Sequence, residues 1–106
     1  MLNTYKNYIK ENKTNYQVIC EINENYLKEI SGQNNINIAL QNELNFINTL
    51  NLEKIEKLEN NIYKLIIKPE DNILEITNTN DIETAIKKEF GWLNQSGIQI
   101  KNILPL

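Results

Sequence analysis

The sequence predicts a small α+β domain, with an antiparallel sheet of four to five strands and helices packed on one face. Three observations support this prediction. The chain has 106 residues, which is enough for one hydrophobic core and too few for two. Its hydrophobic fraction of 41% and charged fraction of 24% are close to those of folded globular domains. Apolar residues recur with a period of two in some segments and of three to four in others, so strands and helices alternate. We therefore treat residues 1–106 as a single domain.

The first third of the chain is predicted to contain a helix, a strand and a second helix. Residues 4–12 fit a short helix with an aromatic face. In residues 16–22 apolar and polar side chains alternate, which predicts a strand with Cys20 facing the core. Asn25 can cap a second short helix, and Gly32 can end it because glycine tolerates a left-handed backbone.

The middle of the chain is predicted to form a strand followed by helices. Residues 36–40 alternate between apolar and polar side chains, which favours a strand. Residues 42–50 fit either a strand or a helix, and we favour the helix. Residues 51–60 have the spacing of an amphipathic helix, because their apolar positions are three apart. These positions are Leu52, Ile55 and Leu58.

A hairpin is predicted next. Residues 62–67 are rich in β-branched and aromatic side chains, which is typical of a strand. Pro69 stands at the first central position of a type I turn over residues 69–72, and the apolar residues 73–76 follow it. This order predicts two strands joined by the turn.

The last third of the chain is predicted to contain the clearest helix and a final strand. The helix begins at Asn80 with a pattern that resembles a capping box, and Ser96 and Gly97 can close it. The segment from Ile98 to Leu104 then alternates as a strand that Pro105 ends.

Composition excludes several classes of function. The net charge is -3 and the pI is near 5.0, so no strong field attracts nucleic acid or an anionic membrane. Histidine and arginine are both absent, which removes the commonest general base, the commonest zinc ligand and the bidentate phosphate ligand. The chain has 20 Asn and 18 Ile, a bias that an AT-rich coding sequence produces. We expect most of the asparagines to be drift and only some to serve turns or caps.

Catalysis and cofactor binding have little support in the sequence. Cys20 is the single cysteine, so it can form no disulfide within the chain, and it has no histidine base to activate it. We expect a buried packing thiol, no metal and no cofactor. The three glycines are isolated, so there is no phosphate-binding loop. The sequence has neither a secretory signal nor a membrane-spanning stretch, and with one cysteine this predicts a cytoplasmic protein.

Trp92 is the first candidate for contact with a partner. On a helical wheel it lies off the apolar stripe of the helix that begins at Asn80, with Glu89 at the edge of that stripe. Exposed tryptophans are enriched among binding hot spots. We therefore predict a contact surface formed by Glu89, Trp92 and Leu93. The alternative is that Trp92 covers the end of the core.

Two further segments are candidates for contact. Glu53, Glu56 and Glu59 would lie along one side of the helix predicted at 51–60 and could meet a basic partner. The segment containing Ile100 could add to the strand of a partner or form a homodimer if it lies at a sheet edge. If that strand is central, its apolar residues are core instead.

Elimination therefore favours a non-enzymatic protein that acts by protein–protein contact. AT-rich chains of this size are common among the products of mobile elements, so we expect a stoichiometric inhibitor. It would be of the immunity, antitoxin or phage-borne anti-defence type, such as an anti-CRISPR protein. Its partner would be a larger, basic or nucleic-acid-handling protein or complex, with no direct contact with nucleic acid or membrane. The alternatives are a homo-oligomeric structural or accessory subunit, and a small enzyme that uses carboxylate, tyrosine and lysine chemistry.

Overall fold

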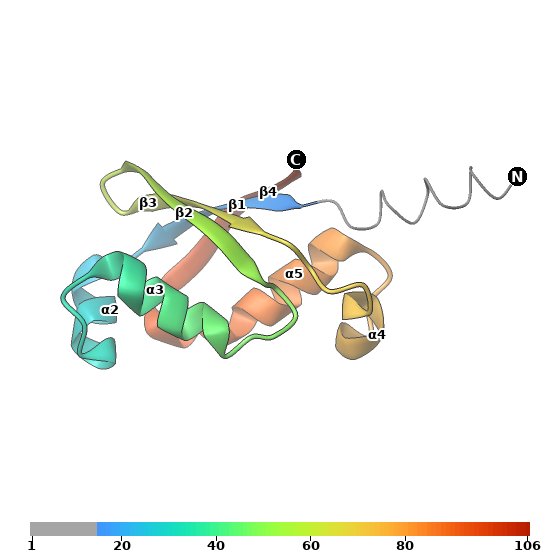
Figure 1. Ribbon diagram of the computed structural model, residues 1–106, viewed down its shortest axis with the longest axis horizontal. Helices are drawn as coiled ribbons and strands as arrows, with labels where there is room; N and C mark the ends of the chain where they lie inside the picture. The colour runs from blue at the N-terminus through green and yellow to red at the C-terminus, as the bar shows by residue number, and fades with distance from the viewer. Residues whose placement is uncertain (1–14) are drawn as a thin grey trace, which may run out of the picture.

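The computed structural model describes residues 15–106, and the helix predicted at 4–12 lies outside the described residues. The described chain forms two layers (Figure 1). One layer is a four-stranded antiparallel sheet and the other consists of helices packed on one face of it. The α+β class predicted from the sequence is confirmed.

The elements follow one another in a regular order along the chain. The strands are β1 (Tyr16–Ile22), β2 (Leu52–Glu59), β3 (Ile62–Ile67) and β4 (Ile98–Pro105). The helices are α2 (Glu24–Ser31), α3 (Ile36–Asn45), α4 (Ile73–Thr77), α5 (Ile82–Phe90) and the 3-10 helix η1 (Gly91–Ser96).

The sheet has the strand order β2-β3-β1-β4. Strands β1 and β2 are connected through α2 and α3, yet β3 lies between them. In the same way, β3 and β4 are connected through helices while β1 lies between them. Two split βαβ units are therefore interleaved in one sheet. This arrangement leaves β2 and β4 at the two edges.

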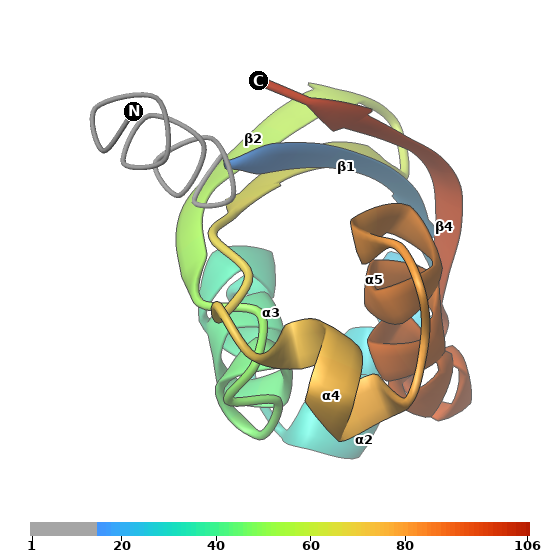
Figure 2. The same ribbon diagram turned by 90° about the vertical axis from the view of Figure 1, so that its right-hand side faces the viewer.

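The core lies between the sheet and the helices, which Figure 2 shows beneath the concave face of the curved sheet. Along β1 and β3 every second side chain is buried against α3 and α5. Each buried Leu or Ile contributes roughly 1.5–3 kcal/mol to folding. The fully buried large side chains are Val18, Cys20, Ile22, Leu27, Leu40, Leu50, Leu65, Ile67, Ile73, Ile86 and Ile98. The predicted inward position of Cys20 is confirmed.

The outer face of the sheet is open. No helix of residues 15–106 covers it in Figure 2, and its central side chains are only partly buried. They include Ile19 of β1 and Lys64 and Ile66 of β3. The face therefore mixes apolar and charged groups.

Side chains of the residues before the helices satisfy the first free backbone N–H groups. The amide oxygen of Asn23 accepts from the N–H of Tyr26, at the start of α2, and Asp81 accepts from Thr84 at the start of α5. The predicted caps were Asn25 and Asn80, so both predictions missed the capping residue by one or two positions. Gly32 ends α2 with a φ of +69°, as predicted.

The predicted strand at 36–40 is wrong, because these residues begin α3. Asn35 caps this helix, and the side chains that it buries have helical spacing. Ile38, which completed the alternating pattern, is 44% exposed. The helix favoured for residues 42–50 is correct as far as Asn45.

The predicted amphipathic helix at 51–60 is also wrong, because this segment is strand β2. Two irregularities in the pairing with β3, between Leu52 and Lys54 and between Lys57 and Glu59, each insert an extra residue. An insertion turns the strand period of two into a local spacing of three. The apolar positions therefore have helical spacing although the segment is a strand.

The hairpin was predicted at the wrong place. Residues 73–77 form the short helix α4, in which Ile73 and Thr77 are buried one turn apart. The observed hairpin joins β2 to β3, where Asn61 adopts a left-handed φ of +66°. The strands predicted at 16–22, 62–67 and from Ile98 are confirmed.

Candidate protein-binding surface

Trp92 is 70% exposed because of the way in which α5 ends. After Phe90 the chain tightens from an α-helix into the 3-10 helix η1, which repeats every three residues. Phe90, Leu93 and Ser96 then follow one buried line. Trp92 lies beside that line and projects into solvent, so it does not cover the end of the core.

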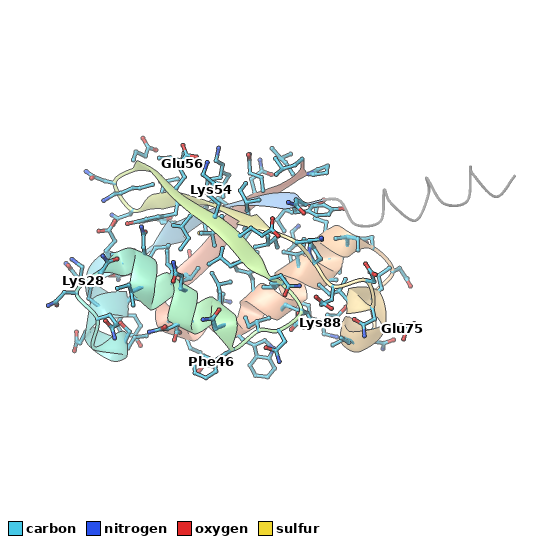
Figure 3. All side chains as sticks on the ribbon, viewed as in Figure 1. Lys28, Phe46, Lys54, Glu56, Glu75 and Lys88 are labelled. Atoms are coloured by element: carbon cyan, nitrogen blue, oxygen red, sulfur yellow. The ribbon has the colours of Figure 1, made fainter. Side chains whose placement is uncertain are left out.

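Phe46 is 84% exposed, and the sequence analysis did not single it out. It follows the last residue of α3, between the buried Leu44 and Ile47. Figure 3 shows its ring pointing away from the sheet, on the helical side of the molecule. The sequence gives no signal for this exposure, because Phe46 fits the apolar pattern of residues 42–50 as well as its buried neighbours do.

Two hydrogen bonds join the segments that carry these rings. The Thr49 hydroxyl donates to Glu89 over 2.7 Å, and the Ser96 hydroxyl donates to Glu43. Glu43 precedes Thr49 on one segment, whereas its partner Ser96 follows Glu89 on the other. The two segments therefore run antiparallel. Phe46 and Trp92 fall between the two bonds. We call these two residues the aromatic patch.

The structure changes the roles of the other residues predicted for this surface. Leu93 is 3% exposed and belongs to the core, so its prediction as a contact residue is wrong. Its position on the three-residue repeat of η1 buries it. Glu89 is partly buried and is held by Thr49, so it positions the neighbouring segment. Trp92 is the predicted residue that the structure leaves accessible here.

Glu53, Glu56 and Glu59 were predicted to share one side of a helix, but residues 52–59 form strand β2. Glu56 lies on the outer face, opposite Lys64, and forms an ion pair with it at 3.3 Å. Glu53 accepts a hydrogen bond from Asn15. Lys54 and Lys57 lie between these glutamates, so the charges alternate along β2. Glu53, Glu56 and Glu59 therefore form no continuous acidic surface.

Ile100 lies on β4, and β4 is an edge strand. Its register places it opposite Cys20, so its side chain lies on the helical face of the sheet, where it is partly buried. No strand of residues 15–106 pairs with the other side of β4, and Ile100 itself belongs mainly to the core.

The structure also contains a carboxylate, a tyrosine and a lysine in contact. The Tyr63 hydroxyl donates to Glu24 over 2.9 Å, and the Lys57 ammonium lies 3.1 Å from the same oxygen. The hydrogen bond from Tyr63 is the main cause that lowers the pKa of Glu24. Burial, followed by the bond to Glu24, raises the pKa of Tyr63. At neutral pH the carboxylate of Glu24 is charged and the phenol of Tyr63 is protonated, so the hydrogen bond and the ion pair both form. They connect α2, which carries Glu24, to strands β2 and β3 of the sheet.

The thiol of Cys20 and the scatter of the acidic side chains limit the chemistry of the described residues. Burial raises the pKa of the Cys20 thiol to about 12, so thiolate is scarce at neutral pH. Within residues 15–106, no three His, Cys, Asp or Glu side chains gather to hold a metal ion. None of the helices in this range combines the length and the apolar character needed to cross a bilayer.

Comparisons with protein-family models, with curated proteins and with solved structures find no match for this chain.

Proposed function

We propose that this protein acts without catalysis, by binding a larger protein through the aromatic patch. The observation that carries the proposal is the exposure of two large aromatic side chains on segments that hydrogen bonds hold together. Large aromatic residues, tryptophan above all, anchor protein–protein interfaces because they bury a large area at a small entropic cost. Leaving them in water has no folding benefit, so a binding role explains their exposure.

The finer proposal is a stoichiometric inhibitor of the anti-defence, immunity or antitoxin type. Its small size and net charge of -3 fit a partner that presents an apolar pocket within a basic surface. Proteins that handle nucleic acid commonly carry such surfaces. The free, buried Cys20 fits a reducing cytoplasmic setting.

The test is affinity purification of the tagged chain from lysate of its host, with mass spectrometry of the proteins that co-elute. Trp92→Ala and Phe46→Ala should each weaken binding of the partner by about thirtyfold or more, the loss expected of a hot-spot residue. Ile76→Ala is the matched control, because Ile76 is 55% exposed on α4, outside the patch. It should bind as the unmodified chain does.

The inhibitor form of the proposal needs a second measurement. The activity of the purified partner should fall to a minimum at one equivalent of this protein and stay intact with Trp92→Ala. Binding without loss of activity would reduce the proposal to a binding module. Equal recovery of partners by all variants would reject the aromatic patch.

The position of β4 at a sheet edge favours one alternative, a homo-oligomeric structural or accessory subunit. In that case Lys101→Glu, a change at an exposed residue of β4, should convert a dimer in solution to a monomer.

A further inference from the structure

Strand β2 forms the other edge of the sheet. It has β3 on one side, and no strand of residues 15–106 lies on its other side. An edge strand offers free backbone N–H and C=O groups to another strand. Natural edges are often protected by charge, and β2 is rich in charge, but its signs alternate. Such an edge repels some strands and attracts others, according to their register.

A groove borders the edge of β2. It separates α3 from this edge, and it is lined on one side by residues 52–55. On the α3 side the lining consists of the amide side chains Asn37, Gln41 and Asn45. Because these side chains are uncharged, α3 opposes no charge of a strand that pairs with this edge.

The pairing with β3 fixes the direction of each side chain in the regular part of β2. Ile55 lies opposite the buried Leu65, so Ile55 and Lys57 are on the helical face. Lys54 and Glu56 are on the open outer face. Lys54 has no ion pair with any residue in the described range, whereas Glu56 pairs with Lys64 at 3.3 Å.

A second copy of the chain can pair with this edge about a two-fold axis. In an antiparallel pair, residues that lie opposite each other share one face of the sheet, and neighbours along a strand lie on different faces. A residue of β2 therefore cannot lie opposite its own neighbour in the second copy. The two-fold axis must instead pass where one residue of β2 lies opposite the same residue of the second copy. An axis at Lys54, Glu56 or Lys57 places that charge against its own copy. An axis at Ile55 places isoleucine against isoleucine, and Lys54 against Glu56 of the second copy, twice. Of these four registers, this one alone has complementary charges.

We propose that the protein forms a two-fold homodimer through β2, centred on Ile55, with one continuous sheet running across both copies. The outer face then carries two ion pairs between Lys54 and Glu56, and the helical face carries the contact between the two Ile55 side chains. Cross-strand pairs of these kinds each contribute to sheet stability. The dimer does not use the aromatic patch, so it is independent of the proposed function.

Strand β4 lacks the features that select a partner in this way. Lys101 is its single charged residue, and it is the extra residue where the pairing with β1 shifts. Pro105, near the end of the strand, has no N–H to donate. No register of β4 is therefore favoured by charge.

The first test is a disulfide trap. The two-fold register puts the Cα atoms of residue 55 about 4.5–5.5 Å apart, which a disulfide can span. Oxidised Ile55→Cys should therefore become a covalent dimer. Leu58→Cys is the control, because it keeps all charges of β2 and is already 46% exposed, yet its two copies would lie roughly 20 Å apart. Cys20 is buried and does not compete.

The second test exchanges charges and measures the solution mass over a range of concentrations. Lys54→Glu and Glu56→Lys should each raise the dissociation constant of the dimer by about tenfold or more, because each places like charges in opposition twice. An equal mixture of the two variants should dimerise again, since the two carboxylates of one variant then face the two ammonium groups of the other. This recovery also shows that both variants are folded. Lys101→Glu, on the other edge, should have no effect.

Three results would overturn the proposal. The unmodified chain could remain monomeric at millimolar concentration. Ile55→Cys could cross-link no faster than Leu58→Cys. The dimer could be lost with Lys101→Glu and kept with Lys54→Glu, which would assign the contact to β4.

Discussion

At the scale of single residues, Tyr63 connects the core to the surface. Its ring is buried on β3, and its hydroxyl reaches Glu24 at the start of α2. Lys57 lies 5.8 Å from the centre of the same ring and pairs with the same carboxylate. One side chain therefore fixes a helix to the sheet through packing and through a hydrogen bond to a charged group.

This contact makes stability depend on pH in a defined direction. The pKa of Glu24 is lower in the folded protein than in the unfolded chain. Glu24 therefore stabilises the fold above its unfolded pKa of about 4.3, and this stabilisation is lost as the pH falls through the folded pKa. Tyr63→Phe removes the main cause of the lowered pKa. We expect the pKa of Glu24 to rise, and the difference in unfolding free energy between the two proteins to shrink in acid.

The measurement is an NMR titration of the Glu24 side chain together with urea unfolding at neutral and acidic pH. Tyr26→Phe is the control, because the hydroxyl of Tyr26 makes no hydrogen bond among residues 15–106. An unchanged pKa of Glu24 in Tyr63→Phe would contradict the prediction.

At the scale of elements, the ends of the helices depend on a few residues with unusual backbone conformations. Gly32 ends α2 and Gly97 ends η1, both with positive φ. Asn51, Asn61 and Asn78 adopt positive φ where the chain turns, which asparagine tolerates better than most residues. These asparagines therefore have structural roles despite the general bias of the composition.

The two glycines should respond differently to alanine. Gly32 has open space where a Cβ would lie, so Gly32→Ala should cost about 1 kcal/mol for the backbone conformation alone. At Gly97 the added Cβ would lie 3.1 Å from the ring of Tyr26 and 3.2 Å from Asn23 Cβ. Gly97→Ala should therefore be the more destabilising variant. Urea denaturation of both would test this order, and an equal loss at the two sites would contradict it.

At the scale of the whole molecule, residues 15–106 share one core, because their helices cover a single face of the sheet. Small domains of this kind have total stabilities of about 5–15 kcal/mol. A single central side chain can therefore decide whether the protein folds.

Leu65 is fully buried on β3, with β1 on one side and β2 on the other. Leu65→Ala should cost about 2–5 kcal/mol, through lost burial and the cavity that remains. Leu104→Ala, at an apolar residue that is 44% exposed, should change stability by no more than about 0.5 kcal/mol. Chemical denaturation followed by circular dichroism measures both. Similar losses in the two variants would contradict a core confined to the helical face.

The sequence predicted the fold class and three of the four strands, because periodicity was sufficient there, and it gave the exposure of Trp92 as one of two alternatives. It failed for β2 and α3, where two patterns competed. The insertions in β2 give its apolar residues a helical spacing. In α3, Ile38 makes the apolar residues alternate as in a strand, although its side chain is exposed on the helix. Phe46 was missed because exposure at the end of a helix depends on how that helix packs, and periodicity within residues 42–50 does not encode this packing.

The interleaved order of the strands has a consequence for how the chain folds. Strand β1 pairs with β3 and β4, and in this sheet Cys20 lies opposite Ile100, far away along the chain. Closing such distant loops is entropically costly, and folding slows as contacts become more distant in sequence. Strand β1 is made before β3, and its pairing is complete only after β4 has followed. Until then one edge of β1 offers free backbone N–H and C=O groups, which favours aggregation during folding.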